Sequence, residues 1–111
     1  MKPLEVEILV AELGVNGDSD QLYHIAYEGT ITDEEHFTVL GGDAEAISER
    51  ISAAFADGWD LGAALKAAVS ALAGPDRTLS AGDLEVATLS RGNGRRTFAR
   101  ISEEELALLL T

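Results

Sequence analysis

The segment 4–11 constrains the fold most, because apolar residues occupy both of its strand faces. Every second residue from position 4 to position 10 is apolar. Glutamates stand between them at first, but Leu9 and Ala11 make the second face apolar as well. This pattern predicts a strand that runs from a solvated end into a layer covered on both sides. The cover must come from a second sheet or from the rest of a larger protein.

Two further strands are predicted to complete an antiparallel meander. Turn-forming residues fill positions 14–20, and the strand that follows, 21–27, places Tyr23, Ile25 and Tyr27 on one face. Glu28-Gly29-Thr30 predicts a turn, and the third strand is expected at Phe37-Thr38-Val39-Leu40. Links this short join neighbouring antiparallel strands.

The middle of the chain predicts two helices that pack on the sheet carrying residues 4–10. Gly41-Gly42-Asp43 opens the first, over about 44–56, with Asp43 as N-cap and an apolar stripe formed by Ile47, Ile51 and Phe55. Asp60 caps the second, which runs to about Leu72 before the stop at Gly74-Pro75. Its expected buried side holds Leu61, Leu65, Ala68, Val69 and Leu72. Eleven of the 17 alanines lie between 44 and 73, and such small side chains allow close helix packing.

The last third predicts a β-hairpin and a short helix. Strands at 84–89 and 97–101 flank Gly92-Asn93-Gly94, a strong turn signal. Ser102 and Glu105 form a capping box before a helix with Leu106, Leu109 and Leu110. The order βββ-αα-ββ-α predicts an α+β fold, antiparallel strands with an αα-hairpin layer, in a single domain over 1–111.

Charge and composition exclude several classes of function. The chain has 20 acidic and 8 basic residues, and residues 1–60 hold 14 of the acidic residues against two basic ones. The net charge of −12 repels nucleic acid and anionic lipid. No apolar run reaches 18 residues and no signal-peptide core begins the chain, so we expect a cytoplasmic protein. Without cysteine there is no disulfide and no thiolate site, and the redox compartment is left open.

Four groups of residues could carry chemistry, and each has a simpler structural interpretation. Gly41-Gly42-Asp43 could hold an anion but lacks the other residues of a phosphate loop, so tight strand-to-helix packing is favoured. Asp33-Glu34-Glu35-His36 has metal-ligand types without a second cluster, which favours an acidic loop. His24 is interpreted as a packed histidine, since no motif supplies a nucleophile beside it. The four arginines from Arg91 to Arg100 are expected to contact another subunit or the acidic half of the chain.

Several stretches together resemble a known family. Residues 2–12, Lys-Pro-Leu-Glu-Val-Glu-Ile-Leu-Val-Ala-Glu, resemble the segment K-P-Y-E-V-E-L-x-V-A-E of actinobacterial proteasome α-type subunits. The similarity continues at 22–29 and 36–42, and resumes at 84–87 and 95–101. The chain looks like the C-terminal half of such a subunit, and a long upstream half is expected to be missing.

The resemblance implies a fold and a function. The fold would be half of the four-layer αββα architecture of N-terminal-nucleophile hydrolases, and the missing half would cover the exposed sheet. The function would be that of a non-catalytic structural subunit of the proteasome α ring, involved in assembly and gated protein degradation by a threonine-type endopeptidase complex. The partners would be other α-type and β-type subunits. No catalytic residue, cofactor-binding residue or metal ligand is expected.

Two other functions stay open. A degenerate N-terminal-nucleophile hydrolase would need a leading Thr, Ser or Cys, whereas this chain begins Met-Lys-Pro. A free-standing dimeric α+β binding module is the other alternative. A bare sheet with unpaired edges also predicts that the isolated chain forms a homodimer, by stacking sheet on sheet, and not a seven-membered ring.

Overall fold

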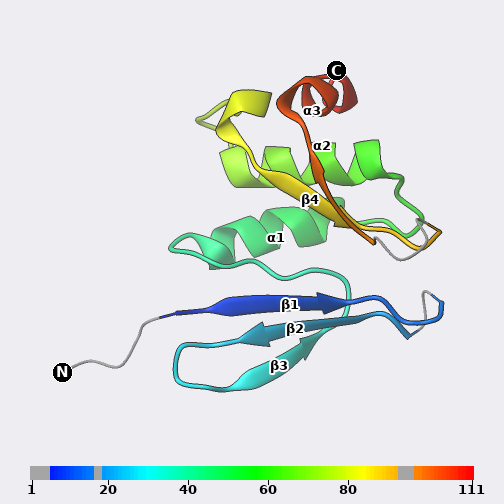
Figure 1. Cartoon of the computed structure of the whole chain (residues 1–111). Helices are drawn as coiled ribbons and strands as arrows, with labels where there is room; N and C mark the ends of the chain where they lie inside the picture. The colour runs from blue at the N-terminus through cyan, green and yellow to red at the C-terminus, as the bar shows by residue number, and fades with distance from the viewer. Residues whose placement is uncertain (1–5, 17–18, 93–96) are drawn as a thin grey trace. The chain divides into compact units, whose positions relative to one another are not determined.

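The computed structural model describes residues 6–16, 19–92 and 97–111. The predicted order βββ-αα-ββ-α is confirmed, with one short 3₁₀ helix added between the second helix and the fourth strand (Figure 1). The chain divides into two compact units, residues 1–44 and residues 45–111.

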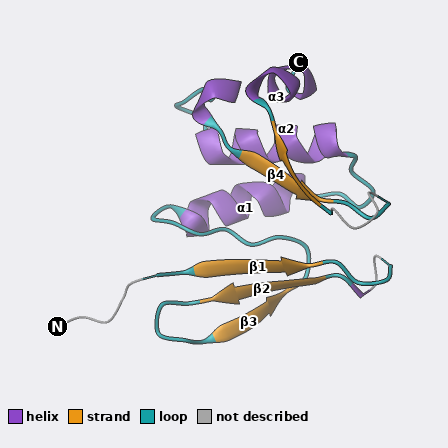
Figure 2. Ribbon diagram, in the orientation of Figure 1, coloured by secondary structure: helices purple, strands orange, loops and turns teal. Residues whose placement is uncertain are grey.

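The first unit contains the predicted antiparallel meander, drawn as orange arrows in Figure 2. Its strands are β1 (Ile8–Glu12), β2 (Gln21–Ile25) and β3 (Ile31–Glu34), in the spatial order β1-β2-β3. Val10 lies opposite Tyr23, which in turn lies opposite Asp33. Because directly paired residues share a face, this register places Ile8, Val10, Tyr23, Ile25 and Ile31 on one face of the sheet.

The prediction of a third strand at 37–40 was wrong, because the chain turns back earlier. The N–H of Ala26 donates to the Thr30 carbonyl at 2.9 Å, and the N–H of Gly29 donates to the Ala26 carbonyl at 2.8 Å. Gly29 has φ +96°, a conformation that glycine adopts without a steric penalty. The β-branched residues Ile31 and Thr32 therefore pair with β2 at once, and 37–40 has no regular secondary structure.

The residues of β1 are accessible on both faces of the strand. All five residues of β1 are exposed, and even Val10 keeps 40% of its surface accessible. Leu9 is exposed on one face while Ile8 and Val10 are exposed on the other. The predicted strand 4–11 is confirmed from Ile8 onward, whereas residues 6 and 7 are not part of it and residues 4 and 5 lie outside the described residues.

The second unit holds the buried core, formed by helices α1 (Ala44–Ala54), α2 (Leu61–Ala73) and α3 (Glu103–Leu109). The buried hydrophobic residues of the described chain lie on these helices: Ile47, Leu65, Ala71 and Leu106, of which Leu106 is the most buried. Arg50 joins α1 to α2, since its Nε donates to the Ala71 carbonyl at 2.8 Å. The predicted buried stripe of α1 is confirmed at Ile47, while Ile51 and Phe55 are half-buried.

The buried side of α2 differs from the predicted one. Leu61 and Leu72 were expected to be buried but are 44% and 39% exposed, whereas Ala71 is 3% exposed. Successive helical residues turn by about 100° around the axis, so the buried side is rotated from Leu72 toward Ala71. Both leucines also lie at the ends of α2, where fewer neighbouring side chains surround them.

The predicted helix ends are largely confirmed. Asp60 Oδ1 accepts a hydrogen bond from the Ala63 N–H at 2.7 Å, and Gly74 ends α2 with φ +70° while its N–H donates to the Ser70 carbonyl. Ser102 Oγ accepts from the Glu105 N–H at 3.2 Å, as one half of the predicted capping box. Asp43 stands directly before α1, and its role as N-cap stays a prediction.

The predicted hairpin is present as β4 (Val86–Leu89) and β5 (Phe98–Ile101), with Val86 opposite Ile101. Its turn at Gly92-Asn93-Gly94 lies partly outside the described residues. The added 3₁₀ helix, η2, spans Ala81–Asp83. No helix in the described ranges is long and apolar enough to cross a membrane.

Candidate functional site

The acidic segment Asp33-Glu34-Glu35-His36 spans the end of β3 and the two residues that follow it. Asp33 and Glu34 belong to β3 and so point to opposite faces of the sheet, which corrects their assignment to a loop. His36 Nε2 lies 4.0 Å from Glu35 Oε1, and both side chains are exposed. Within the described ranges, no three His, Cys, Asp or Glu residues are grouped so as to hold a metal ion.

His24 lies in β2, opposite Leu9, and is half-buried. Its Nε2 atom is 2.7 Å from Oε2 of Glu7, the residue just before β1. The sequence predicted a packed histidine between apolar neighbours, but the ring has a carboxylate partner on an accessible face. This contact ties the start of β1 to β2. A histidine base in nucleophilic catalysis contacts a hydroxyl or thiol besides an orienting carboxylate, and the described contact of His24 is with the carboxylate alone, which favours a structural role.

The segment Gly41-Gly42-Asp43 forms an exposed turn at the start of α1. Gly41 has φ +121°, and its carbonyl accepts a hydrogen bond from the Ala44 N–H at 3.3 Å. Glycine is needed at position 41 because side-chain-bearing residues rarely adopt this φ. The glycine at position 41 is therefore explained by the turn that it forms, without any bound anion.

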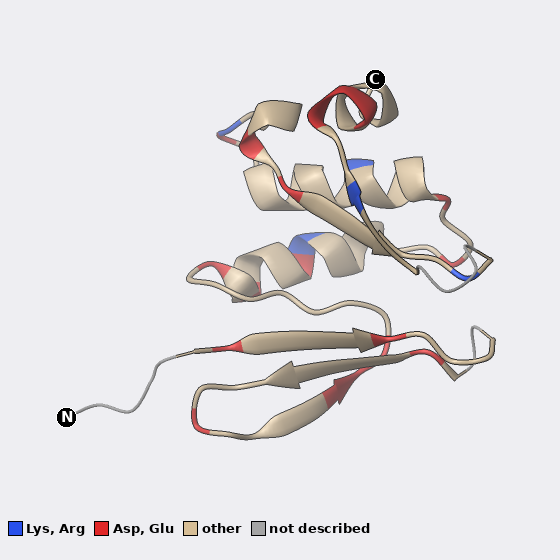
Figure 3. Cartoon of the chain, viewed as in Figure 1, with Lys and Arg blue, Asp and Glu red and all other residues tan. Residues whose placement is uncertain are grey.

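The arginine cluster makes a local contact on the second unit. Arg95 and Arg96 lie outside the described residues. Arg100 Nη2 lies 4.0 Å from Glu85 Oε2, and both side chains are highly exposed. Glu85 lies just before β4, so the described partner of Arg100 belongs to its own hairpin and not to the acidic residues 1–60. In Figure 3 the Lys and Arg positions are drawn in blue and the Asp and Glu positions in red.

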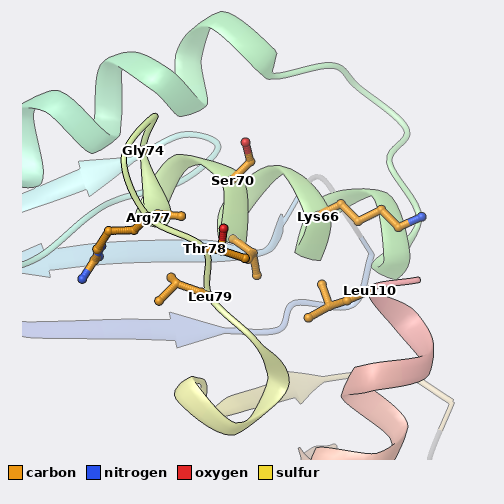
Figure 4. A pocket seen from close by; sticks show the side chains of 9 residues that line it. Lys66, Ser70, Gly74, Arg77, Thr78, Leu79 and Leu110 are labelled. Carbon is orange, nitrogen blue, oxygen red and sulfur yellow. The ribbon is translucent and has the colours of Figure 1, made fainter.

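A cavity of about 280 Å³ lies beside α2 in the second unit. The turn at Gly74 leads the chain back along α2, so that residues 77–79 face the helix from which they came (Figure 4). The cavity is lined by Lys66, Val69, Ser70, Ala73, Gly74, Arg77, Thr78, Leu79 and Leu110. Lys66 and Arg77 extend away from each other at its two ends. Arg77 Nη2 donates to the Leu72 carbonyl at 3.0 Å and so stabilises the end of α2.

The cavity beside α2 has basic and hydroxyl groups in its lining. Its lining provides two cations and two hydroxyls, but no carboxylate or imidazole that could act as a base. A catalytic hydroxyl needs a base within hydrogen-bond reach, and no described hydrogen bond joins Lys66 to Ser70 or Thr78. The sequence analysis did not find this cavity. The sequence signal nearest to the cavity is the helix stop at Gly74-Pro75. A helix stop alone does not predict the direction in which the chain continues.

A second contact missed in the sequence joins Ser80 to Asp83 around η2. Asp83 Oδ2 accepts from the Ser80 N–H at 2.9 Å and from the Ser80 hydroxyl at 3.1 Å. These two hydrogen bonds lower the pKa of Asp83 below its ordinary value of 3.8, and the positive charge of Arg77 lowers it further. The pattern Ser80-Ala81-Gly82-Asp83 is a short capping box that could have been recognised.

The contacts and the cavity described above do not assign the chain to a family, so it was compared with known proteins. No family model matches the chain. The proteasome subunit alpha of Saccharopolyspora erythraea is 44% identical over 113 residues, which cover 99% of this chain and 44% of that protein. The proteasome subunit alpha of Acidimicrobium ferrooxidans is 47% identical over 106 residues, covering 96% of this chain and 46% of that protein. By sequence, the chain is related to the proteasome α subunits of actinobacteria.

The alignments to these α subunits run across both compact units. The α subunit of Thermobifida fusca is 44% identical over 112 residues, which cover 98% of the chain and 45% of that protein. The chain therefore spans about half the length of the curated proteasome α subunits that it matches. The resemblance predicted from residues 2–12 and the later stretches is confirmed.

Proposed function

We propose that the chain is a non-catalytic structural subunit, or part of one, in the α ring of a proteasome core particle. The observation that carries this proposal is the alignment of 96–99% of the chain with proteins named proteasome subunit alpha, at 44–47% identity. Its role would be assembly of the ring and gated entry of proteins to be degraded. Its partners would be other α-type and β-type subunits, in the cytoplasm.

The fold of the chain supports the proposal that it is part of a larger subunit. Residues 1–111 would form one portion of the four-layer αββα architecture, because a single alignment spans both compact units. The apolar faces of β1, exposed throughout, would be covered when a second sheet is stacked on them. The relatives are about twice as long, so their unmatched portion is long enough to supply such a sheet.

The chain is proposed to be non-catalytic because of the contacts at His24 and the residues that line the cavity beside α2. His24 contacts the carboxylate of Glu7, and the cavity beside α2 has no carboxylate or imidazole in its lining. Neither arrangement provides the activated hydroxyl of a threonine-type peptidase. No cofactor is part of the proposal. In the absence of its partners, the chain would form a homodimer that covers part of the exposed sheet.

The proposal is tested by fragment complementation. The chain is co-expressed with the portion of the Thermobifida fusca α subunit that lies outside the alignment, and separately with the intact α and β subunits. We expect the chain to co-purify with the unmatched portion, and native mass spectrometry is expected to show one copy of each. Fluorogenic peptides incubated with the purified chain are expected to remain uncleaved.

The Leu106→Ala variant, which lacks the most buried side chain, serves as a control for folding in this experiment. A chain that is folded by circular dichroism but associates with neither set of partners would contradict the proposed role in the α ring. Peptide cleavage that survives repurification and is blocked by a threonine-directed inhibitor would contradict the non-catalytic assignment.

A further inference from the structure

We draw no further inference here: the strongest candidate, the cavity of about 280 Å³ that lies beside α2 and is lined by residues 77–79, has its two cations, Lys66 and Arg77, extending away from each other, and nothing in the structure shows what covers it.

Discussion

The two units of the chain use equally apolar sequences in opposite ways. In the first unit, β1 consists of four apolar residues and a glutamate, and every one of them is exposed. In the second unit, α2 is also rich in apolar residues but buries Leu65 and Ala71. The difference teaches that an apolar pattern determines which element forms, whereas burial depends on what faces that element. The helices bury side chains among themselves, whereas all five residues of β1 are exposed.

The largest expected effect comes from breaking the core of the second unit. Leu106→Ala removes a side chain that is 1% exposed and leaves a cavity among the helices. The free energy of unfolding is expected to fall by about 2–5 kcal/mol, measured by chemical denaturation. Thermal melting is expected to shift in the same direction.

Two substitutions to alanine at exposed positions, one of a leucine and one of an isoleucine, are the controls for Leu106→Ala. Leu108→Ala on the same helix, at 76% exposure, and Ile31→Ala in the first unit, at 65%, are expected to change stability by no more than about 0.5 kcal/mol. If Ile31→Ala destabilised the chain as much as Leu106→Ala, the contrast between an open sheet and a packed helical unit would be wrong.

Much of the fold could be predicted because local signals agreed with one another. Asp60 and Gly74 mark the two ends of α2 through capping chemistry that depends only on nearby residues. The order of elements and the antiparallel pairings of β1 with β2 and of β4 with β5 were also predicted correctly. The third strand was misplaced because 37–40 is as apolar as a strand, while the turn at Gly29 acts closer in sequence and pairs Ile31 with Ile25 first.

The candidate sites were harder to predict because they depend on contacts distant in sequence. Glu7 lies 17 residues before His24, and only the pairing of β1 with β2 brings them together. Arg50 lies 21 residues before Ala71, whose carbonyl it contacts. The cavity beside α2 requires the direction of the chain after Gly74, which no local pattern gives. By contrast, the Ser80–Asp83 contact is local and was simply overlooked.

A smaller effect is expected at the N-terminus of α2, where the second unit relies on a single cap. Asp60→Ala removes the acceptor of the Ala63 N–H, and the unfolding free energy is expected to fall by about 0.5–2 kcal/mol. Asp57→Ala is the charge-matched control, since it removes an exposed aspartate three residues earlier in the turn. Equal losses in urea denaturation of the two variants would show that charge, and not the cap, is responsible.

The smallest expected effect is a pH dependence at Asp83 that the open sheet of the first unit should not share. The Ser80 hydrogen bonds lower the pKa of Asp83 below 3.8 in the folded chain, so the folded state favours the ionised carboxylate more than the unfolded state does. The stability that this preference provides is fully present above the unfolded pKa. It is lost as the pH falls through the lower, folded pKa.

The Asp83→Asn substitution tests this dependence. The difference in unfolding free energy between wild type and variant is expected to be constant near neutral pH and to shrink as the pH falls below 3.8. Asp76→Asn removes the same charge from the neighbouring loop, where no described contact joins it to Ser80. Because Asp83 is fully exposed, the effect is expected to be small, and urea titrations of the three proteins at matched ionic strength are needed to separate it from general charge effects. A difference that grows on acidification, or that is the same for Asp76→Asn, would mean that the Ser80 contact does not favour the carboxylate in the folded chain.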